Sequence, residues 1–300
     1  MVPVALLRLS AAAAGLAALP ARAHHAEGSA PGAAWNLDPV VLLPLVAAAL
    51  LYFIGVRRLW RRAGRGRGVS VSEASRFGAG WGVLAIALVS PLDGLGEALF
   101  SAHMAQHELL MTLAAPLLVL GRPIEAWTWG LAPAWRGPLA ELARAPAIEW
   151  PLAFASRPLS AWLLHATAIW AWHVPAFFEA ALRDPGVHAL QHASFLGTAI
   201  LFWWSVFGRG IRKPDSASVA GVFTTMLHSG GLGALLTFAP TVWYVHYAST
   251  TFPYGLTALE DQQLGGLVMW GPGGLPYLAI GLAIVGAWLA RGRSAAAAFR

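Results

Sequence analysis

Residues 39–67 read PVVLLPLVAAALLYFIGVRRLWRRAGRGR, and this stretch decides the fold class of the chain. Its first part, 39–56, is apolar and long enough to cross a hydrocarbon core of about 30 Å as a helix. Arginines follow this run at once: Arg57, Arg58, Arg61, Arg62, Arg65 and Arg67. Because positive charges beside a membrane helix mark its cytoplasmic side, this helix is predicted to start outside and end in the cytoplasm.

The composition of the whole chain also indicates a membrane protein. Of its 300 residues, 57% are hydrophobic and 11% are charged, whereas a soluble domain carries about 25% charged residues. The net charge is +6, but the arginines form short clusters between apolar runs and no single basic face, which argues against nucleic acid as a partner. The chain has no cysteine, which excludes disulfides and thiolate metal sites. Any metal would need His, Met or carboxylate ligands.

Further apolar runs predict more membrane-spanning helices. They are expected near 76–92, 100–120, 159–178, 188–207, 216–240 and 263–290. With 39–56 they give about seven transmembrane helices, the N-terminus outside and the C-terminus inside. The linkers that alternation then places in the cytoplasm carry most of the other arginines, and the opposite loops are mainly acidic. We therefore predict an all-α fold, a polytopic, multi-pass membrane helix bundle in the bacterial inner (plasma) membrane.

Residues 1–23 have the pattern of a secretory signal peptide. They combine Arg8, an alanine- and leucine-rich run and the small-residue ending Ala21-Arg22-Ala23. The seven-helix domain is then expected at 24–300. An uncleaved first helix is the alternative, and it leaves the orientation of 39–56 unchanged.

Aromatic residues are frequent where the chain is expected to meet the membrane surface. The longest linker, 121–158, interleaves tryptophans with prolines and arginines, which predicts a cytoplasmic, interfacial loop. The pairs Trp203-Trp204 and Trp243-Tyr244 lie near predicted helix ends. We expect these pairs to belong to the aromatic belt of the membrane surface and to carry no chemistry.

Histidines are the side chains in this chain most suggestive of function. His103 and His107 are four residues apart near the start of one predicted helix, on one face, and His188 and His192 repeat this spacing on another. His173 lies near the end of 159–178. The topology derived from the arginines places all five near the outer surface. Ionisable residues in a membrane are costly, so this coincidence predicts a metal or cofactor site, with a proton relay or helix-packing hydrogen bonds as the alternative.

The methionines narrow the identity of the metal. Imidazole suits copper, zinc, iron and nickel, whereas thioether sulfur selects Cu(I). Met104 adjoins His103, and Met269 lies near the start of the last predicted helix. Copper, as Cu(I), is therefore the first choice. The remaining histidines stay outside the core site with open roles: His24, His25, His165, His228 and His246.

Several motifs, taken in order, carry a family resemblance. They are SAHMAQHELL (101–110), PLLVLGRP (116–123), WAWHVP (170–175), the histidine pair before LFWW (201–204), and DQQLGGLVMW (261–270). Over about residues 75–285 they resemble the CtaG family of multi-helix assembly factors for caa(3)-type cytochrome c oxidase in bacteria. The resemblance implies a seven-helix membrane protein that matures the oxidase by supplying copper. The positions that match are His103, Met104, His107, His173, His188, His192, Gln263 and Met269.

These observations leave three functions open. The first is a copper-binding assembly factor that is no enzyme, with oxidase subunits, membrane lipid and a periplasmic copper carrier as partners. The second is a haem-binding membrane cytochrome, because paired histidines can be axial ligands. The third is a copper or proton transporter, suggested by the deeper positions of His165 and His228. Hydrolase or transferase chemistry is disfavoured, because no Ser-His-Asp set, phosphate loop or carboxylate pair is recognisable.

Overall fold

The computed structural model describes residues 34–208 and 216–298, with side chains up to residue 290. Within these ranges every element of regular structure is a helix. This confirms the all-α class. The predicted signal peptide, His24, His25 and most of the linker 208–215 lie outside the described residues.

The helices follow one another with short connections. They are α2 (Pro39–Ala63), α3 (Val71–Val89), α4 (Pro91–Ala98), α5 (Phe100–Glu108), the π-helix η1 (Leu109–Ala114), α6 (Ala115–Leu120), α7 (Pro123–Gly130), α8 (Pro133–Arg144), α9 (Pro146–Ala155), α10 (Pro158–Trp172), α11 (Pro175–Arg183), α12 (Pro185–Phe207), α13 (Ser216–Thr237), the 3₁₀ helices η2 (Val245–Ser249) and η3 (Phe252–Tyr254), α14 (Ala258–Trp270) and α15 (Gly274–Ala298).

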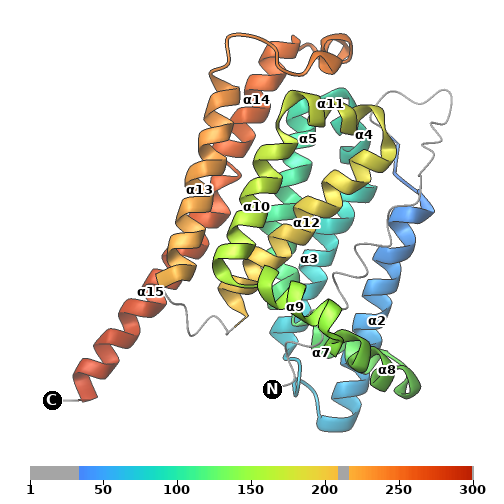
Figure 1. The fold of residues 1–300 in the computed structure, drawn as a ribbon, viewed down its shortest axis with the longest axis vertical. Helices are drawn as coiled ribbons and strands as arrows, with labels where there is room; N and C mark the ends of the chain where they lie inside the picture. Colours follow the sequence, from blue (N-terminus) through green and yellow to red (C-terminus); the bar gives the residue numbers. More distant parts are fainter. Residues whose placement is uncertain (1–33, 209–215, 299–300) are drawn as a thin grey trace.

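The long helices run side by side along the length of the molecule (Figure 1). The short helices α4 and α11 lie at one end of this bundle, and α7 and α8 lie at the other, beside the C-terminal part of α2. Different elements therefore lie at the two ends of the bundle. The first carries the beginnings of α5 and α12, and the second carries the arginine block that follows 39–56.

Several helices have the length and apolarity of membrane spans. Among the described residues these are Pro39–Ala63, Ser216–Thr237 and the segment Ala258–Ala290, which joins α14 to most of α15. Two bent pairs, Val71–Val89 with Pro91–Ala98 (46°) and Phe100–Leu120 with Pro123–Gly130 (62°), raise the number to five if each pair is one span. The structure thus fits a membrane protein. The other two crossings and the sides of the termini stay predictions.

Proline explains where the helices differ from the predicted ones. The expected helix 159–178 is divided between α10 and α11, because Pro175 opens α11 at its first position. Within the predicted interfacial loop 121–158 the chain forms three short helices, α7, α8 and α9, which begin at Pro123, Pro133 and Pro146. Proline suits the first turn of a helix, where no intrahelical N–H bond is needed, and it prevents the preceding helix from continuing.

The core contains aromatic residues that the sequence placed at the membrane surface. Trp203 is fully buried, and its Nε1 donates a hydrogen bond to the Met111 carbonyl at 2.8 Å. Tyr244 is also buried and stacks on Phe100. The expectation that these two residues belong to an aromatic belt was therefore wrong. Hydropathy locates helix ends along the chain, but it does not tell which face of a helix meets a neighbouring helix.

Candidate metal centre

The N-terminus of α5 is fixed by a residue from another helix. Asp261 on α14 is fully buried and accepts hydrogen bonds from the Phe100 N–H at 2.6 Å and the Ser101 N–H at 3.1 Å. The Ser101 hydroxyl donates to the same carboxylate at 2.5 Å. The first N–H groups of a helix have no intrahelical partner, and the residue at the start of α5, Leu99, supplies no side-chain cap. Asp261 therefore sets the position of the turn that carries His103.

The N-terminus of α12 is capped within its own segment. The Asp184 side chain accepts hydrogen bonds from the Gly186 N–H at 2.7 Å and the Val187 N–H at 3.0 Å. Pro185 occupies the first turn. A capping carboxylate followed by proline is a strong helix start. It places His188 and His192 on consecutive turns of one face, opposite α5.

Four imidazoles meet between α5 and α12, and we call them the histidine cluster: His103, His107, His188 and His192. Ring centroids are 4.3 Å apart for His103 and His107 and 4.2 Å apart for His188 and His192. Across the helices, His103 lies 5.4 Å from His188, and His107 lies 5.2 Å from His192. The structure thus brings both predicted pairs into one group.

The nitrogens of this cluster are spaced as metal ligands are. One nitrogen each from His103, His188 and His192 lie within 4.8 Å of one another. The Nε2 atoms of His188 and His192 are 3.0 Å apart. Ligands bound to one ion at about 2.0 Å lie about 3–4 Å apart. A small inward movement of these side chains would therefore let them share one ion.

The hydrogen bonds of His103 leave one ring nitrogen free for a metal. Its Nδ1 lies 3.3 Å from the Gly96 carbonyl, to which it can donate. In this tautomer Nε2 carries the lone pair, and among the described residues it has no hydrogen-bond partner although it is buried. Both ring nitrogens of His107 are also buried without a hydrogen-bond partner among these residues, and in either tautomer one of them carries the lone pair. Buried polar atoms normally have partners, and a metal-binding imidazole normally donates its other N–H to a carbonyl. These residues therefore fit a metal ion.

His173 lies beside a thioether. Its Nδ1 donates to the Ile169 carbonyl at 2.6 Å, so its Nε2 carries the lone pair, and this atom lies 3.4 Å from the Met104 sulfur. Both side chains are buried. Neither atom of the contact has a proton to donate, so a soft cation between them would convert two facing lone pairs into two ligand bonds. Ligand bonds of about 2.0 Å to nitrogen and 2.3 Å to sulfur suit this separation.

Two phenyl rings connect this pair to the histidine cluster. The Phe178 ring lies 5.0 Å from that of His103 and 6.3 Å from that of His173. The Phe195 ring lies 4.6 Å from that of His107 and 6.2 Å from that of His173. The pair of His173 and Met104 is therefore a neighbouring position, close to the cluster and walled by the same apolar rings.

The remaining residues predicted from sequence lie elsewhere. Met269 is buried between α13 and α14, where its Cβ faces Gly233, and a ligand role for it stays a prediction. His165 is buried, with its Nδ1 3.0 Å from the Thr198 hydroxyl. His228 on α13 accepts a hydrogen bond from the Trp170 indole at 3.3 Å. The Nε2 atoms of both residues are buried and have no hydrogen-bond partner among the described residues, and both lie outside the histidine cluster.

The structure adds residues that sequence reasoning did not select. The Tyr247 hydroxyl donates to the Gly96 carbonyl at 2.9 Å and lies 3.3 Å from Nδ1 of His103, and the Tyr244 hydroxyl donates to the His173 carbonyl at 2.9 Å. Gln191 lies on α12, between His188 and His192 in the sequence. It is fully buried and lies beside His103 of α5. An amide between two paired histidines is the one local signal that could have identified it. The tyrosines come from the segment between α13 and α14, and nothing local relates them to α5.

One family model and several bacterial proteins match this chain. The family model of the cytochrome c oxidase caa3 assembly factor (Caa3_CtaG) matches residues 50–291. Uncharacterized proteins of Mycobacterium bovis and Mycobacterium tuberculosis are each 28% identical over 275 residues, which cover 87% of this chain and 40% of theirs. An uncharacterized protein of Mycobacterium leprae is 26% identical over 267 residues, 85% of this chain and 39% of its own.

The chain thus spans about 40% of the length of the curated relatives it matches. No solved structure matches it significantly. The family match runs from the middle of α2 through most of α15 and includes every residue of the histidine cluster. The chain belongs to the family of cytochrome c oxidase caa3 assembly factors, Caa3_CtaG.

Proposed function

We propose that this assembly factor binds Cu(I) through the histidine cluster and the pair of His173 and Met104, and supplies it to cytochrome c oxidase. The observation that carries the proposal is the set of buried imidazole nitrogens without partners among the described residues: His103 Nε2, His107 Nδ1 and His107 Nε2. They face His188 and His192 across the interface of two helices. A buried, prearranged set of nitrogen donors is the requirement for holding a metal ion.

The chemistry of the donors favours the monovalent ion. The ligands are neutral imidazoles and a thioether, which is a soft donor set. The cost of burying a charge rises with its square, so Cu(I) enters such an uncharged, apolar site at a lower cost than a divalent ion. Without a carboxylate ligand, nothing in the set compensates a second positive charge. The proposed ion is cargo, and the site performs binding and ligand exchange without catalysis.

The position of the site in the bundle supports delivery outside the cytoplasm. The cluster lies at the end that carries α4 and α11, whereas the arginine block at the C-terminal part of α2 lies at the other end (Figure 1). By the positive-inside rule the arginines are cytoplasmic and the copper site is periplasmic. This assignment belongs to the proposed seven-helix topology, with the N-terminus outside. A periplasmic copper carrier is then the proposed donor, and the oxidase subunits are the proposed acceptors.

Haem binding is disfavoured by the same geometry. Axial ligation would place the plane of a porphyrin between the two imidazoles. The rings of the cluster contact one another directly, with centroid separations of 5.4 Å between His103 and His188 and 5.2 Å between His107 and His192. A macrocycle does not fit between them without separation of α5 from α12.

Competitive Cu(I) titration of the purified full chain in detergent, without oxygen and against a chromogenic chelator, tests the proposal. We expect His103→Ala/His192→Ala to lower Cu(I) affinity by about 100-fold, because it removes two ligands. His228→Ala is the matched control, since this histidine lies on α13 against Trp170, and its affinity should equal that of the wild type. Unchanged copper affinity and stoichiometry in a folded double variant would falsify the proposal.

Copper X-ray absorption distinguishes the thioether position. The loaded wild type should show nitrogen scatterers at about 2.0 Å and a sulfur scatterer at about 2.3 Å. Met104→Leu keeps the buried volume and should remove only the sulfur contribution. A wild-type spectrum with nitrogen alone would eliminate Met104 as a ligand and leave the histidine cluster intact.

A further inference from the structure

A basic groove lies at the end of the bundle opposite to the histidine cluster, where α2 meets α7 and the start of α8 (Figure 1). It is a shallow depression that is open to the surface, with a volume of about 470 Å³. We call it the arginine groove, and it is lined by Arg58, Arg61, Arg62, Trp129, Pro133 and Arg136. Neither the proposed copper function nor the family description involves this groove.

The arginines of the groove are arranged around one indole ring. The guanidinium carbons of Arg62 and Arg136 lie 5.8 Å and 4.9 Å from the centroid of the Trp129 ring. Arg58 donates through one nitrogen to the carbonyls of Trp129, Gly130 and Leu131, at 3.1, 2.6 and 3.0 Å. Stacking on an aromatic face and hydrogen bonds at the C-terminal end of α7 hold these cations in place. The groove is therefore organised and is more than a set of charges on flexible side chains.

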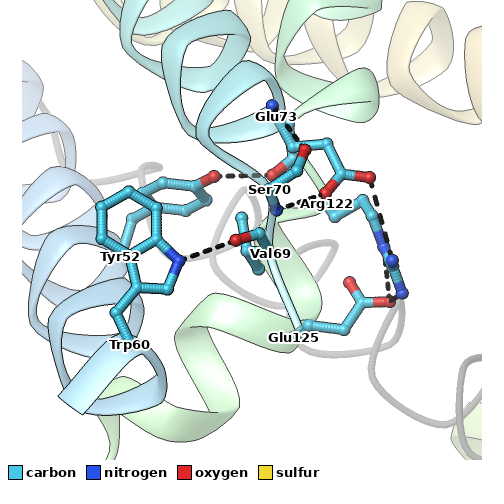
Figure 2. Close-up of polar contacts among 8 residues, drawn as sticks. Tyr52, Trp60, Val69, Ser70, Glu73, Arg122 and Glu125 are labelled. Carbon is cyan, nitrogen blue, oxygen red and sulfur yellow. Dashed lines mark hydrogen bonds and ion pairs between the residues drawn. The ribbon is translucent and has the colours of Figure 1, made fainter. Parts of the chain in front are cut away.

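The arginines of the groove form no ion pair within the described part of the chain. None of the ion pairs found there involves Arg58, Arg61, Arg62 or Arg136. Arg122, at the start of α7, provides a contrast. Figure 2 shows it between Glu73 and Glu125, with nitrogen to oxygen distances of 3.8 Å and 2.6 Å. Four like charges around one groove repel one another, and an anionic ligand would relieve that repulsion.

The groove lies at the level expected for lipid headgroups. Arg58, Arg61 and Arg62 occupy the last turns of the candidate span Pro39–Ala63. Nearby on α8, Trp135 is 62% exposed, as is typical of tryptophans at a membrane surface. Guanidinium groups match phosphate oxygens in a two-pronged geometry. We propose that the arginine groove binds the phosphate headgroup of an anionic phospholipid, and thereby holds α2, α7 and α8 together at the membrane surface.

Lipid binding by the purified full chain tests this proposal. The delipidated protein in a nonionic detergent is given phosphatidylglycerol, phosphatidylcholine or inorganic phosphate, and bound lipid is measured by native mass spectrometry, together with the unfolding temperature. We expect phosphatidylglycerol to bind and to raise the unfolding temperature. Phosphatidylcholine and inorganic phosphate should do neither. Equal binding of both lipids, or binding of inorganic phosphate as tight as that of the lipid, overturns the assignment to an anionic lipid.

Two triple variants separate the groove from the general positive charge of this end. Arg61→Ala/Arg62→Ala/Arg136→Ala removes three charges from the groove, and we expect it to weaken phosphatidylglycerol binding by about 10-fold or more. The matched control, Arg57→Ala/Arg65→Ala/Arg67→Ala, removes three charges from the same arginine block outside the groove lining, and its binding should stay within about 2-fold of the wild type. Equal losses in the two variants, at equal helix content by circular dichroism, overturn the proposal.

Discussion

Replacement of Asp261 tests how the proposed copper site is held in place. This carboxylate is fully buried and accepts hydrogen bonds from two backbone N–H groups at the start of α5, those of Phe100 and Ser101. A hydrogen bond to a charged group contributes about 1.5–3 kcal/mol, so loss of the two backbone bonds alone gives about 3–6 kcal/mol for Asp261→Ala. The Ser101 hydroxyl loses its acceptor as well. Asp261→Asn keeps one carbonyl oxygen as an acceptor, and we expect about half of that loss.

The same replacement should also weaken copper binding. His103 lies two residues after Ser101, on the turn that Asp261 caps. Loss of a group that orients a metal ligand typically lowers metal affinity about 10–100-fold, and we expect about 10-fold for Asp261→Ala in the Cu(I) titration. Stability is measured by unfolding in detergent with increasing dodecyl sulfate, followed by circular dichroism.

Asp38 provides the matched control for both measurements. Its carboxylate caps α2 by accepting a hydrogen bond from the Val40 N–H at 2.8 Å, but α2 carries no proposed ligand. Asp38→Ala should cost about 1 kcal/mol and leave copper affinity unchanged. If Asp261→Ala and Asp38→Ala cost the same, or if folded Asp261→Ala binds copper as the wild type does, then Asp261 does not position His103.

Two further predictions concern backbone geometry, with the same unfolding assay. A Cβ at Gly130 would lie 2.1 Å from the Leu51 carbonyl oxygen, so Gly130→Val should destabilise the contact of α2 with α7 by about 3 kcal/mol. Gly82→Val is the control: a Cβ there has nothing within 4 Å, and the substitution should cost under about 1 kcal/mol. Equal costs would show that α2 and α7 do not pack this closely. Arg122 has a left-handed φ of 51°. The Arg122→Gly variant should be about 1 kcal/mol more stable than Arg122→Ala, because only glycine adopts this conformation freely. Equal stability of the two variants would contradict the positive φ.

The parts of the site that could be predicted from the sequence are those set by local geometry. The spacing of four residues put His103 with His107 and His188 with His192 on single helix faces, and the arginine flanks gave both pairs a common depth. In the structure the two pairs contact each other, which is consistent with their common depth. The all-α class followed from the length and apolarity of the runs in the same way.

The contacts that organise the site could not be predicted, because they join distant segments. Asp261 caps Ser101 across 160 residues, and the Tyr247 hydroxyl reaches Nδ1 of His103 across 144. Hydrophobic periodicity tells which residues share a face of one helix, but it does not tell which helices are neighbours. For the same reason, the sequence paired Met104 with His103, its neighbour along the chain, whereas the structure puts the Met104 sulfur against His173.

This dependence on distant contacts predicts a link between the proposed copper binding and the packing of α14. The proposed ligands lie on α5, on α12 and at His173, which follows α10, whereas the cap of α5 comes from α14. An ion that needs His103 in place would therefore bind more tightly when α14 is docked. By linkage, bound copper must stabilise the docked state by the same factor. Hydrogen exchange at the Phe100 and Ser101 amides should therefore slow when Cu(I) is bound, and this slowing should disappear in Asp261→Ala. An acceptor that displaced α14 would weaken the site and so favour transfer of the ion. Equal exchange of these amides with and without Cu(I) would show that copper binding and this cap are independent.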